Sequence, residues 1–273
     1  MIRIVTDSSA DLSPQVATDH RIEVVPLTIR FGDDEFVDRR DLSAEAFWER
    51  LHRADTLPST AAPSIGAFAD AYQRLAEMGA AGVVAVTISQ DLSGTFQSAT
   101  LAAQDAPLPV RVIDSRTASI PLGLTAIAAA DASRLGADLD DVERAVSRAD
   151  ADLLATLDTL EYLQKGGRIG AAQAFFGGLL NVKPLITFTD GAVAAAGRVR
   201  TRRKALAALL DWISEQEGVT RLGVVHGNAP DIDEFVYQVR ERAPDLEPLV
   251  TLAGPVIGTH AGPGVVGVAV SRT

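Results

Sequence analysis

Short apolar runs alternate with stretches of helical spacing along the first half of the chain. The apolar runs predict strands at residues 2–5, 24–31, 83–88 and 110–113. The strand at residues 83–88 is interrupted only by Thr87, which is typical of a strand buried on both faces. Helices are predicted between and after these strands, at residues 43–53, 64–78, 121–135 and 139–149, with one more starting near residue 93. This alternation predicts an α/β fold with a mainly parallel sheet.

One of these runs contains a proline. Pro26 indicates a sheet edge or a bulge, because proline cannot donate a hydrogen bond to a neighbouring strand. The later part of the run, Thr28–Phe31, is expected to pair with residues 35–37 as a hairpin across the turn Gly32-Asp33-Asp34.

The second half of the chain has a different order of elements. Strands are predicted at residues 153–157, 183–188, 192–195, 222–226, 249–252 and 265–270, and helices at 201–217 and 231–242. Several of these strands follow one another without a helix between them. We therefore place a domain boundary near residue 150, giving an N-terminal domain at 1–150 and a C-terminal domain at 151–273, although no Gly/Ser-rich linker marks it.

Composition narrows the range of functions. Lys and Arg number 25 against 36 Asp and Glu, so the net charge of −11 argues against general nucleic-acid binding. The absence of cysteine excludes disulfides, zinc–thiolate sites and a cysteine nucleophile. The first residues do not read as a secretory signal, and no uncharged apolar stretch of about 18 residues occurs. We therefore expect a cytoplasmic protein with no integral membrane segment.

Polar residues follow three of the predicted parallel strands. Ligands of such sheets bind at the carboxyl ends of the strands, so these loops are expected to share one edge. Individually, each of these residue types is also typical of a helix cap or a turn. The residues are Asp7, Ser8, Ser9, Ser93, Thr95, Asp114 and Ser115.

The tripeptide Ser93-Gly94-Thr95 follows a buried strand and opens a helix. Backbone N–H groups and hydroxyls at a helix start suit an oxyanion, and Gly94 lets a ligand approach the backbone. The P-loop pattern is absent, and Asp91 stands where a nucleophile elbow needs glycine. Thr60, in a loop held by prolines, could face the same anion. The alternative is that these residues only cap and shape loops.

Two other segments contain candidate ligand-binding residues. Lys165-Gly166-Gly167-Arg168 sets two cations around a glycine pair, which suits a carboxylate or phosphate, or is a solvated turn. His260 lies in the glycine-rich stretch at residues 258–264, which we interpret as a loop from which the ring reaches a ligand. No pair of the 4 histidines has a metal-ligand spacing, so no metal site is predicted.

Residues 198–204 form a basic run in this acidic chain. The run, with Arg200, Arg202 and Arg203, could dock an acidic partner or a phosphorylated ligand, or form a solvated strand end. The apolar stretch with Phe175, Phe176, Leu179 and Leu180 is expected to be a packed core helix, with the wall of an apolar cavity as the alternative.

Taken together, these segments resemble the DegV family of bacterial fatty-acid-binding proteins over essentially the whole chain. The order and spacing of the segments make the resemblance specific. They read VTDSSADL at residues 5–12, PLTI at 26–29, TAAPS at 60–64, LSGTFQSA at 92–99, LEYLQKGGRI at 160–169, KP at 183–184 and GTHAGPG at 258–264.

The resemblance implies a two-domain α/β architecture, mainly parallel in its N-terminal domain and mixed in its C-terminal domain. It also implies one bound long-chain fatty acid, with its tail in a cavity to which the C-terminal domain contributes. In the family, hydroxyls at the Thr60 and Ser93 positions bond the carboxylate. Gly94 and Thr95 belong to the same motif, and Arg168 and His260 match positions near the head group.

This chain departs from the family in one of these loops. The family reads Thr-Ser-Gln-Pro-Ser there, whereas Ala61 and Ala62 replace the two middle polar residues in this chain, which leaves their auxiliary contacts open. Related proteins present the fatty acid to a separate fatty-acid kinase, for which the run around Arg202 resembles a docking surface. No cofactor and no catalytic residue are implied.

Three other hypotheses remain open from the sequence alone. Ser93 could be the nucleophile of an acyl hydrolase or transferase, with His226 or His260 as its base. The chain could carry the phosphoryl acceptor of a kinase system. The basic run alone could support DNA regulation.

Overall fold

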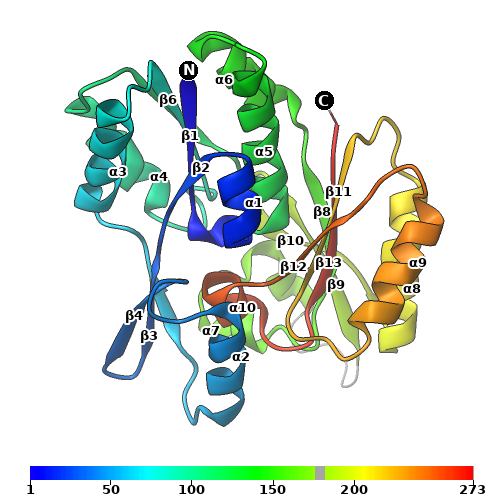
Figure 1. Ribbon diagram of the computed structural model, residues 1–273. Helices are drawn as coiled ribbons and strands as arrows, with labels where there is room; N and C mark the ends of the chain where they lie inside the picture. Colours follow the sequence, from blue (N-terminus) through cyan, green and yellow to red (C-terminus); the bar gives the residue numbers. More distant parts are fainter. Residues whose placement is uncertain (176–181, 273) are drawn as a thin grey trace.

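The computed structural model describes residues 1–175 and 182–272, and it has an α/β fold (Figure 1). The first sheet is wholly parallel, with the strand order β2-β1-β6-β7. This confirms the predicted parallel sheet in the N-terminal part. Its strands are β1 (Ile2–Asp7), β2 (Ile22–Val25), β6 (Gly82–Thr87) and β7 (Val110–Asp114).

Helices cover both faces of this sheet. Strand β6 is buried along its whole length, with Val83 and Ala85 facing one core and Val84 and Val86 facing the other. Three of the helices have an N-cap residue whose side chain accepts a hydrogen bond from the backbone N–H three residues further on. These residues are Ser13, Ser64 and Asp138. The helices are α1 (Pro14–Asp19), α3 (Ile65–Glu77), α4 (Thr95–Gln104), α5 (Ile120–Arg134) and α6 (Leu139–Arg148).

The second sheet is mixed, with the order β10-β9-β8-β13-β11-β12. Strand β11 runs parallel to β12, and the other neighbouring strands of this sheet are antiparallel. Helices α8 and α9 pack on its outer side (Figure 1). Its elements are β8 (Asp152–Thr156), β9 (Lys183–Thr189), β10 (Ala192–Val199), β11 (Arg221–His226), β12 (Leu249–Leu252), β13 (Val266–Ser271), α8 (Arg202–Ser214) and α9 (Ile232–Arg242).

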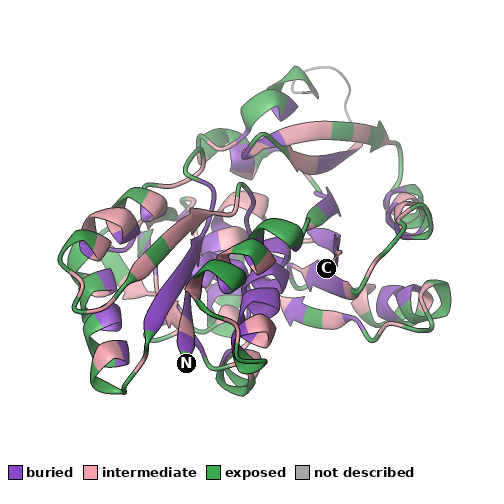
Figure 2. Cartoon of the chain, turned by 90° about the horizontal axis from the view of Figure 1, so that it is seen from above, coloured by how far each residue is buried: buried purple, intermediate pink, exposed green. Residues whose placement is uncertain are grey.

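Helix α5 stands between the two sheets (Figure 1). It contacts β1 and β6 of the first sheet and β11 and β13 of the second. Ile120 and Leu124 belong to the core shared with the second sheet, whereas Leu122 and Ala126 belong to the core of the first. Buried residues therefore run through the middle of the molecule (Figure 2).

The β-rich run at residues 24–31 is divided at Pro26 between two sheets. Strand β2 ends at Val25, and β3 (Thr28–Phe31) pairs instead with β4 (Asp34–Val37), which confirms the hairpin. A third strand, β5 (Ser59–Ala61), pairs with β3 on its other side, although the sequence predicted a loop there. Backbone pairing to β3 draws this polar segment into a sheet.

His260 lies on a helix, not in the loop predicted from its neighbouring glycines. Helix α10 (Pro255–Ala261) ends at Gly262, whose φ of 74° suits glycine. Gly258 serves close packing, because a Cβ there would lie 2.4 Å from the Phe47 ring and 2.9 Å from the Trp48 ring. Both rings belong to α2 (Ala44–Arg53). The remaining short elements are η1 (Ser8–Ala10), α7 (Glu161–Lys165) and η2 (Gly170–Phe175).

The two large sheets share no strand, and the chain passes from β7 to β8 through α5, α6 and residues 149–151. The division at residue 150 into two domains stays a prediction. Phe176, Leu179 and Leu180, interpreted above as core or cavity wall, lie outside the described residues. Within residues 1–175 and 182–272, no helix combines the length and apolar character needed to cross a bilayer.

Candidate functional site

A cavity lies between the two large sheets. It has an empty volume of about 930 Å³, which includes its opening to solvent. Its walls are mostly apolar and come from both halves of the chain. They include Leu27, Ile88 and Leu92 from the first half, and Leu153, Ile186, Phe188, Val225 and Ile257 from the second.

Four polar residues predicted from the sequence face this cavity together. Thr60 comes from β5, Ser93 from the loop before α4, Arg168 from the segment after α7, and His260 from α10. They span 200 residues of sequence but line one space. The structure therefore gathers at one apolar cavity the hydroxyls, the cation and the imidazole that the sequence placed in separate motifs.

Thr60 and His260 contact each other directly. The Thr60 Oγ1 lies 2.9 Å from the His260 Nε2. Burial, reinforced by the charge of Arg168, lowers the pKa of His260 to about 4, so the ring is neutral at physiological pH. Its Nδ1 is buried without a hydrogen-bond partner among the described residues. A Cβ at Gly166 would lie 2.3 Å from that Nδ1, so glycine leaves room for the ring.

Ser93 and Thr95 form a second hydroxyl pair, but only Ser93 faces the cavity. The Ser93 Oγ lies 2.8 Å from the Thr95 Oγ1 and accepts the Thr95 N–H at 3.4 Å. Thr95 is fully buried, so it can act on a ligand only through Ser93. Gly94 lines the cavity beside Ala62, and a Cβ at Gly94 would lie 4.0 Å from that of Ala62.

Arg168 supplies the positive charge of the site. Its Nε donates to the Leu92 carbonyl oxygen at 3.1 Å, and its Nη1 donates to the Gly166 carbonyl oxygen at 2.7 Å. These two backbone contacts fix the guanidinium without neutralising it, and no carboxylate in the described part of the chain forms an ion pair with it. A half-buried, uncompensated cation at an apolar cavity favours an anionic ligand.

The arrangement suits an apolar molecule that carries one carboxylate. The walls would bury the apolar part, while the hydroxyls and the guanidinium would replace the water around the anion. Within residues 1–175 and 182–272, neither His226 nor His260 hydrogen-bonds to Ser93, whose hydroxyl partner is Thr95. No group of potential metal ligands gathers among these residues either.

The polar residues at the end of β1 and directly after it do not join this site. Asp7 is fully buried, where it accepts the Ile88 N–H at 2.7 Å and the Ser9 N–H at 3.0 Å. The Ser8 hydroxyl accepts the Leu27 N–H at 3.0 Å. Asp114 and Ser115 line a different depression. The strands are neighbours as predicted, but these side chains turn inward to hold the loops together.

The sequence reasoning missed Ser119, a polar residue that lines the cavity. Ser119 precedes α5, and Pro121 follows two residues later, so the pair looks like an ordinary helix start. Its φ of 63° and ψ of −149° are disfavoured for a residue with a side chain, a signal visible only in the structure.

The basic run at residues 198–204 lies away from the cavity. Arg202 is occupied within the chain, with its Nε and Nη2 donating to Asp231 at 2.6 Å and 2.7 Å, and its Nη1 to the Gly264 carbonyl oxygen at 2.6 Å. Arg200 and Arg203 are exposed. A docking role for the three arginines stays a prediction, with the two exposed ones better placed to contact a partner.

Comparison with known proteins shows similarity along the whole chain. A family model described as uncharacterised proteins of the DegV family matches residues 1–273. A DegV domain-containing protein of Streptomyces coelicolor is 39% identical, over 99% of this chain and 98% of the relative.

Solved structures show the same similarity in three dimensions. A DegV family protein from Thermus thermophilus, described for its fatty-acid binding, superposes with a TM-score of 0.90 at 33% identity, covering 100% of this chain and 99% of that one. DegV from Bacillus subtilis, described as a fatty acid binding protein, gives a TM-score of 0.91 at 29% identity with the same coverage.

Proposed function

This chain belongs to the DegV family, and from that premise we propose that it is a non-catalytic carrier of one long-chain fatty acid. The carboxylate binds at Thr60 and Ser93, and the acyl tail fills the cavity between the sheets. The observation that carries this proposal is the meeting of Thr60, Ser93, Arg168 and His260 at a cavity whose other walls are mostly apolar. The fatty-acid binding described for the relatives from Thermus thermophilus and Bacillus subtilis supports it.

Tail and head group make different contributions to this binding. A tail of about fifteen methylenes gains about 0.8 kcal/mol for each one buried, which sets an upper limit of about 12 kcal/mol. A buried carboxylate without partners would cost several kcal/mol, so it needs the hydroxyls and the guanidinium. The tail therefore supplies most of the affinity, and the polar groups fix which end of the molecule enters which end of the cavity.

Each polar group has its own part at the carboxylate. The hydroxyls of Thr60 and Ser93 donate hydrogen bonds to the oxygens. Arg168 supplies the compensating charge. His260, neutral because its pKa is lowered to about 4, holds the Thr60 hydroxyl through Nε2 and adds no second charge. Ala62 stands where the family has a polar residue, so the cavity lining beside Thr60 and Ser93 is apolar at this position.

A fatty-acid kinase is the partner that this arrangement favours. The carrier would present the carboxylate to the kinase, which phosphorylates it, and both would work in the cytoplasm, where ATP is available. The exposed Arg200 and Arg203 form a local basic surface on a chain of net charge −11, which suits an acidic surface on the kinase.

Native mass spectrometry tests the central claim. Protein purified from cells should carry an adduct of fatty-acid mass, and the mass defines the chain length and unsaturation. Delipidated protein should regain one equivalent of added oleate or palmitate. Protein that is purified without an adduct and binds neither fatty acid would contradict the proposal.

Removing both hydroxyls should weaken binding without disturbing the fold. In the variant Thr60→Ala/Ser93→Ala, affinity for oleate should fall by about 10- to 100-fold, because each lost hydrogen bond to a charged group is worth about 1.5–3 kcal/mol and water regains part of it. Fluorescence displacement measures the affinity, and circular dichroism checks the fold. Ser98→Ala, on α4 directly after the loop that carries Ser93 but outside the cavity lining, is the matched control. Unchanged affinity in the double variant would place the carboxylate elsewhere.

A further inference from the structure

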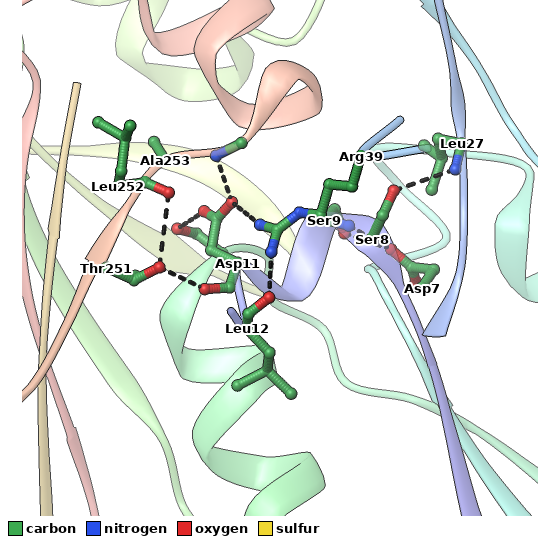
Figure 3. A network of polar contacts seen from close by, with 12 residues as sticks. Asp7, Ser8, Ser9, Asp11, Leu12, Leu27, Arg39, Thr251, Leu252 and Ala253 are labelled. Atoms are coloured by element: carbon green, nitrogen blue, oxygen red, sulfur yellow. Dashed lines mark hydrogen bonds and ion pairs between the residues drawn. The ribbon is translucent and has the colours of Figure 1, made fainter. Parts of the chain in front are cut away.

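A buried polar cluster centres on Asp11 (Figure 3), and it includes Ser119 of the cavity lining. Asp11 is fully buried, directly after η1, with left-handed backbone angles of φ 52° and ψ 27°. Its carboxylate accepts hydrogen bonds from three loops: from the Gly254 N–H at 2.8 Å, the Ser119 hydroxyl at 2.6 Å and the Arg39 guanidinium at 3.4 Å. Arg39 also donates to the Leu12 carbonyl oxygen. Asp11 does not line the cavity.

The contact with Gly254 ties Asp11 to the helix that carries His260. Gly254 is the residue directly before α10, and the helix starts at Pro255. A second tie lies three residues earlier, where the Thr251 hydroxyl donates to the Asp11 carbonyl oxygen at 2.6 Å (Figure 3). One residue of the N-terminal half thus holds the segment before α10 at two points.

Helix α10 is short and brings several groups to the cavity. Val256, Ile257, His260 and Ala261 all line it, and Thr60, the partner of His260, lies on β5 in the other half of the chain. The position of the His260 ring against Thr60 therefore depends on where α10 begins. Asp11 sets that beginning relative to the N-terminal half.

The contact with Ser119 acts on the cavity wall itself. The Ser119 hydroxyl bonds to Asp11 and does not cap α5, and its N–H donates to the Ser9 carbonyl oxygen at 2.9 Å. These two bonds hold Ser119 in backbone angles that residues with a side chain disfavour. Asp11 therefore fixes two lining segments, one from each half of the chain.

We propose that Asp11 is a positioning residue of the fatty-acid site, which sets α10 so that His260 meets Thr60 at the carboxylate end of the cavity. The inference rests on the proposed function. Asp11 touches no ligand. Its effect on the carboxylate passes through His260, and its contact with Ser119 adds a smaller effect through the cavity wall. The charge of Arg39, which lies against it, compensates the buried carboxylate.

The variant Asp11→Asn tests this. It keeps the size of the side chain but replaces one accepting oxygen with an amide and removes the charge. Oleate affinity of delipidated protein should fall by about tenfold, the order expected when a charge-assisted hydrogen bond is lost. The matched control is Asp38→Asn. Asp38 is also a buried carboxylate beside Arg39, with the Ser8 hydroxyl nearby, but no hydrogen bond joins its oxygens to the described segment before α10. The oleate affinity of Asp38→Asn should stay within about twofold of the wild type, because Asp38 forms no hydrogen bond to the segment before α10.

A double-mutant cycle separates positioning from general destabilisation. In a His260→Ala background, Asp11→Asn should cause a clearly smaller loss of affinity than in the wild type, because the main group through which Asp11 acts is gone. Equal losses in both backgrounds would overturn the proposal, as would an Asp11→Asn protein that binds like the wild type.

A second variant covers the case in which Asp11→Asn does not fold. Thr251→Val removes the hydroxyl that donates to Asp11 at nearly constant volume. It should lower oleate affinity by about threefold, a loss that again disappears in the His260→Ala background. Wild-type affinity in Thr251→Val would then overturn the proposal. Failure of the proposed function looks different, because the wild-type protein itself would bind no fatty acid.

Discussion

Replacing Arg168 by methionine should weaken binding of a long-chain fatty acid by about 30- to 100-fold or more. The guanidinium is the one cation among the polar groups that line the described cavity, and no carboxylate of the described chain pairs with it. Without it, the fatty-acid carboxylate would lie in an apolar cavity with only hydroxyls to stabilise it. Removing one partner of a buried charge pair costs about 2–5 kcal/mol, much of it because the other charge is left alone.

The control for this prediction lies in the ligand. Oleyl alcohol has the same tail and no charge, so the affinity of Arg168→Met for the alcohol should stay close to that of the wild type. The oleate affinity of Arg168→Lys should lie between those of the wild type and Arg168→Met. An ammonium keeps the charge but cannot donate to Leu92 and Gly166 in the same fork geometry. Isothermal titration with oleate and oleyl alcohol measures both effects. An equal loss for acid and alcohol would mean that Arg168 shapes the cavity and does not bind the carboxylate.

The largest loss of stability is expected from Trp48→Ala. Trp48 is 1% exposed, its ring packs edge-on against Phe47 with centroids 5.2 Å apart, and its Nε1 donates to the Ala253 carbonyl oxygen at 2.9 Å. A large aromatic residue truncated in a core costs about 3–5 kcal/mol, to which the unpaired carbonyl adds. The free energy of unfolding should therefore fall by about 4 kcal/mol, a large part of the ~5–15 kcal/mol typical of a folded domain.

The chain offers a matched control in its other tryptophan. Trp212 on α8 is only half-buried, so Trp212→Ala should cost clearly less. Trp48→Phe should recover most of the packing but not the hydrogen bond to Ala253. Urea unfolding followed by circular dichroism compares the three variants. Similar losses for Trp48→Ala and Trp212→Ala would show that the contact between α2 and the segment before α10 adds no special stability.

Much of the fold could be predicted because it depends on local patterns. Residues 83–88 are apolar on both sides of the strand, and such a run has few places other than the middle of a parallel sheet. Ser13, Ser64 and Asp138 cap their helices through contacts three residues away, which the sequence displays directly. The hairpin at β3 and β4 follows from one short turn.

The rest depends on contacts between distant residues. Nothing near Pro26 shows that the chain leaves one sheet there and joins another, because the partners of β3 lie at residues 34–37 and 59–61. Gly258 suggested a loop because a glycine needed for close packing against Phe47 looks in sequence like one needed for a turn. The helix that bears His260 could not be recognised for the same reason.

The same distinction between local patterns and distant contacts applies to the candidate site. Thr60, Ser93, Arg168 and His260 could be named from their motifs and from the family resemblance, and they line one cavity. The orientation of the Asp7, Ser8 and Ser9 side chains could not be predicted, because the sequence does not distinguish a buried structural carboxylate from a ligand-binding one. What decides between them is the set of N–H donors that the folded chain supplies, such as that of Ile88 for Asp7.

The position of α5 between the two sheets affects how the protein unfolds. One of its faces completes the core of the parallel sheet, and the other completes the core shared with the mixed sheet. The ion pair of Asp131 with Arg221, at 3.0 Å, adds a polar link from α5 to β11. Neither sheet can lose its helical cover without exposing apolar surface of the other. We therefore expect the two halves to unfold as one cooperative unit, although each has a sheet of its own.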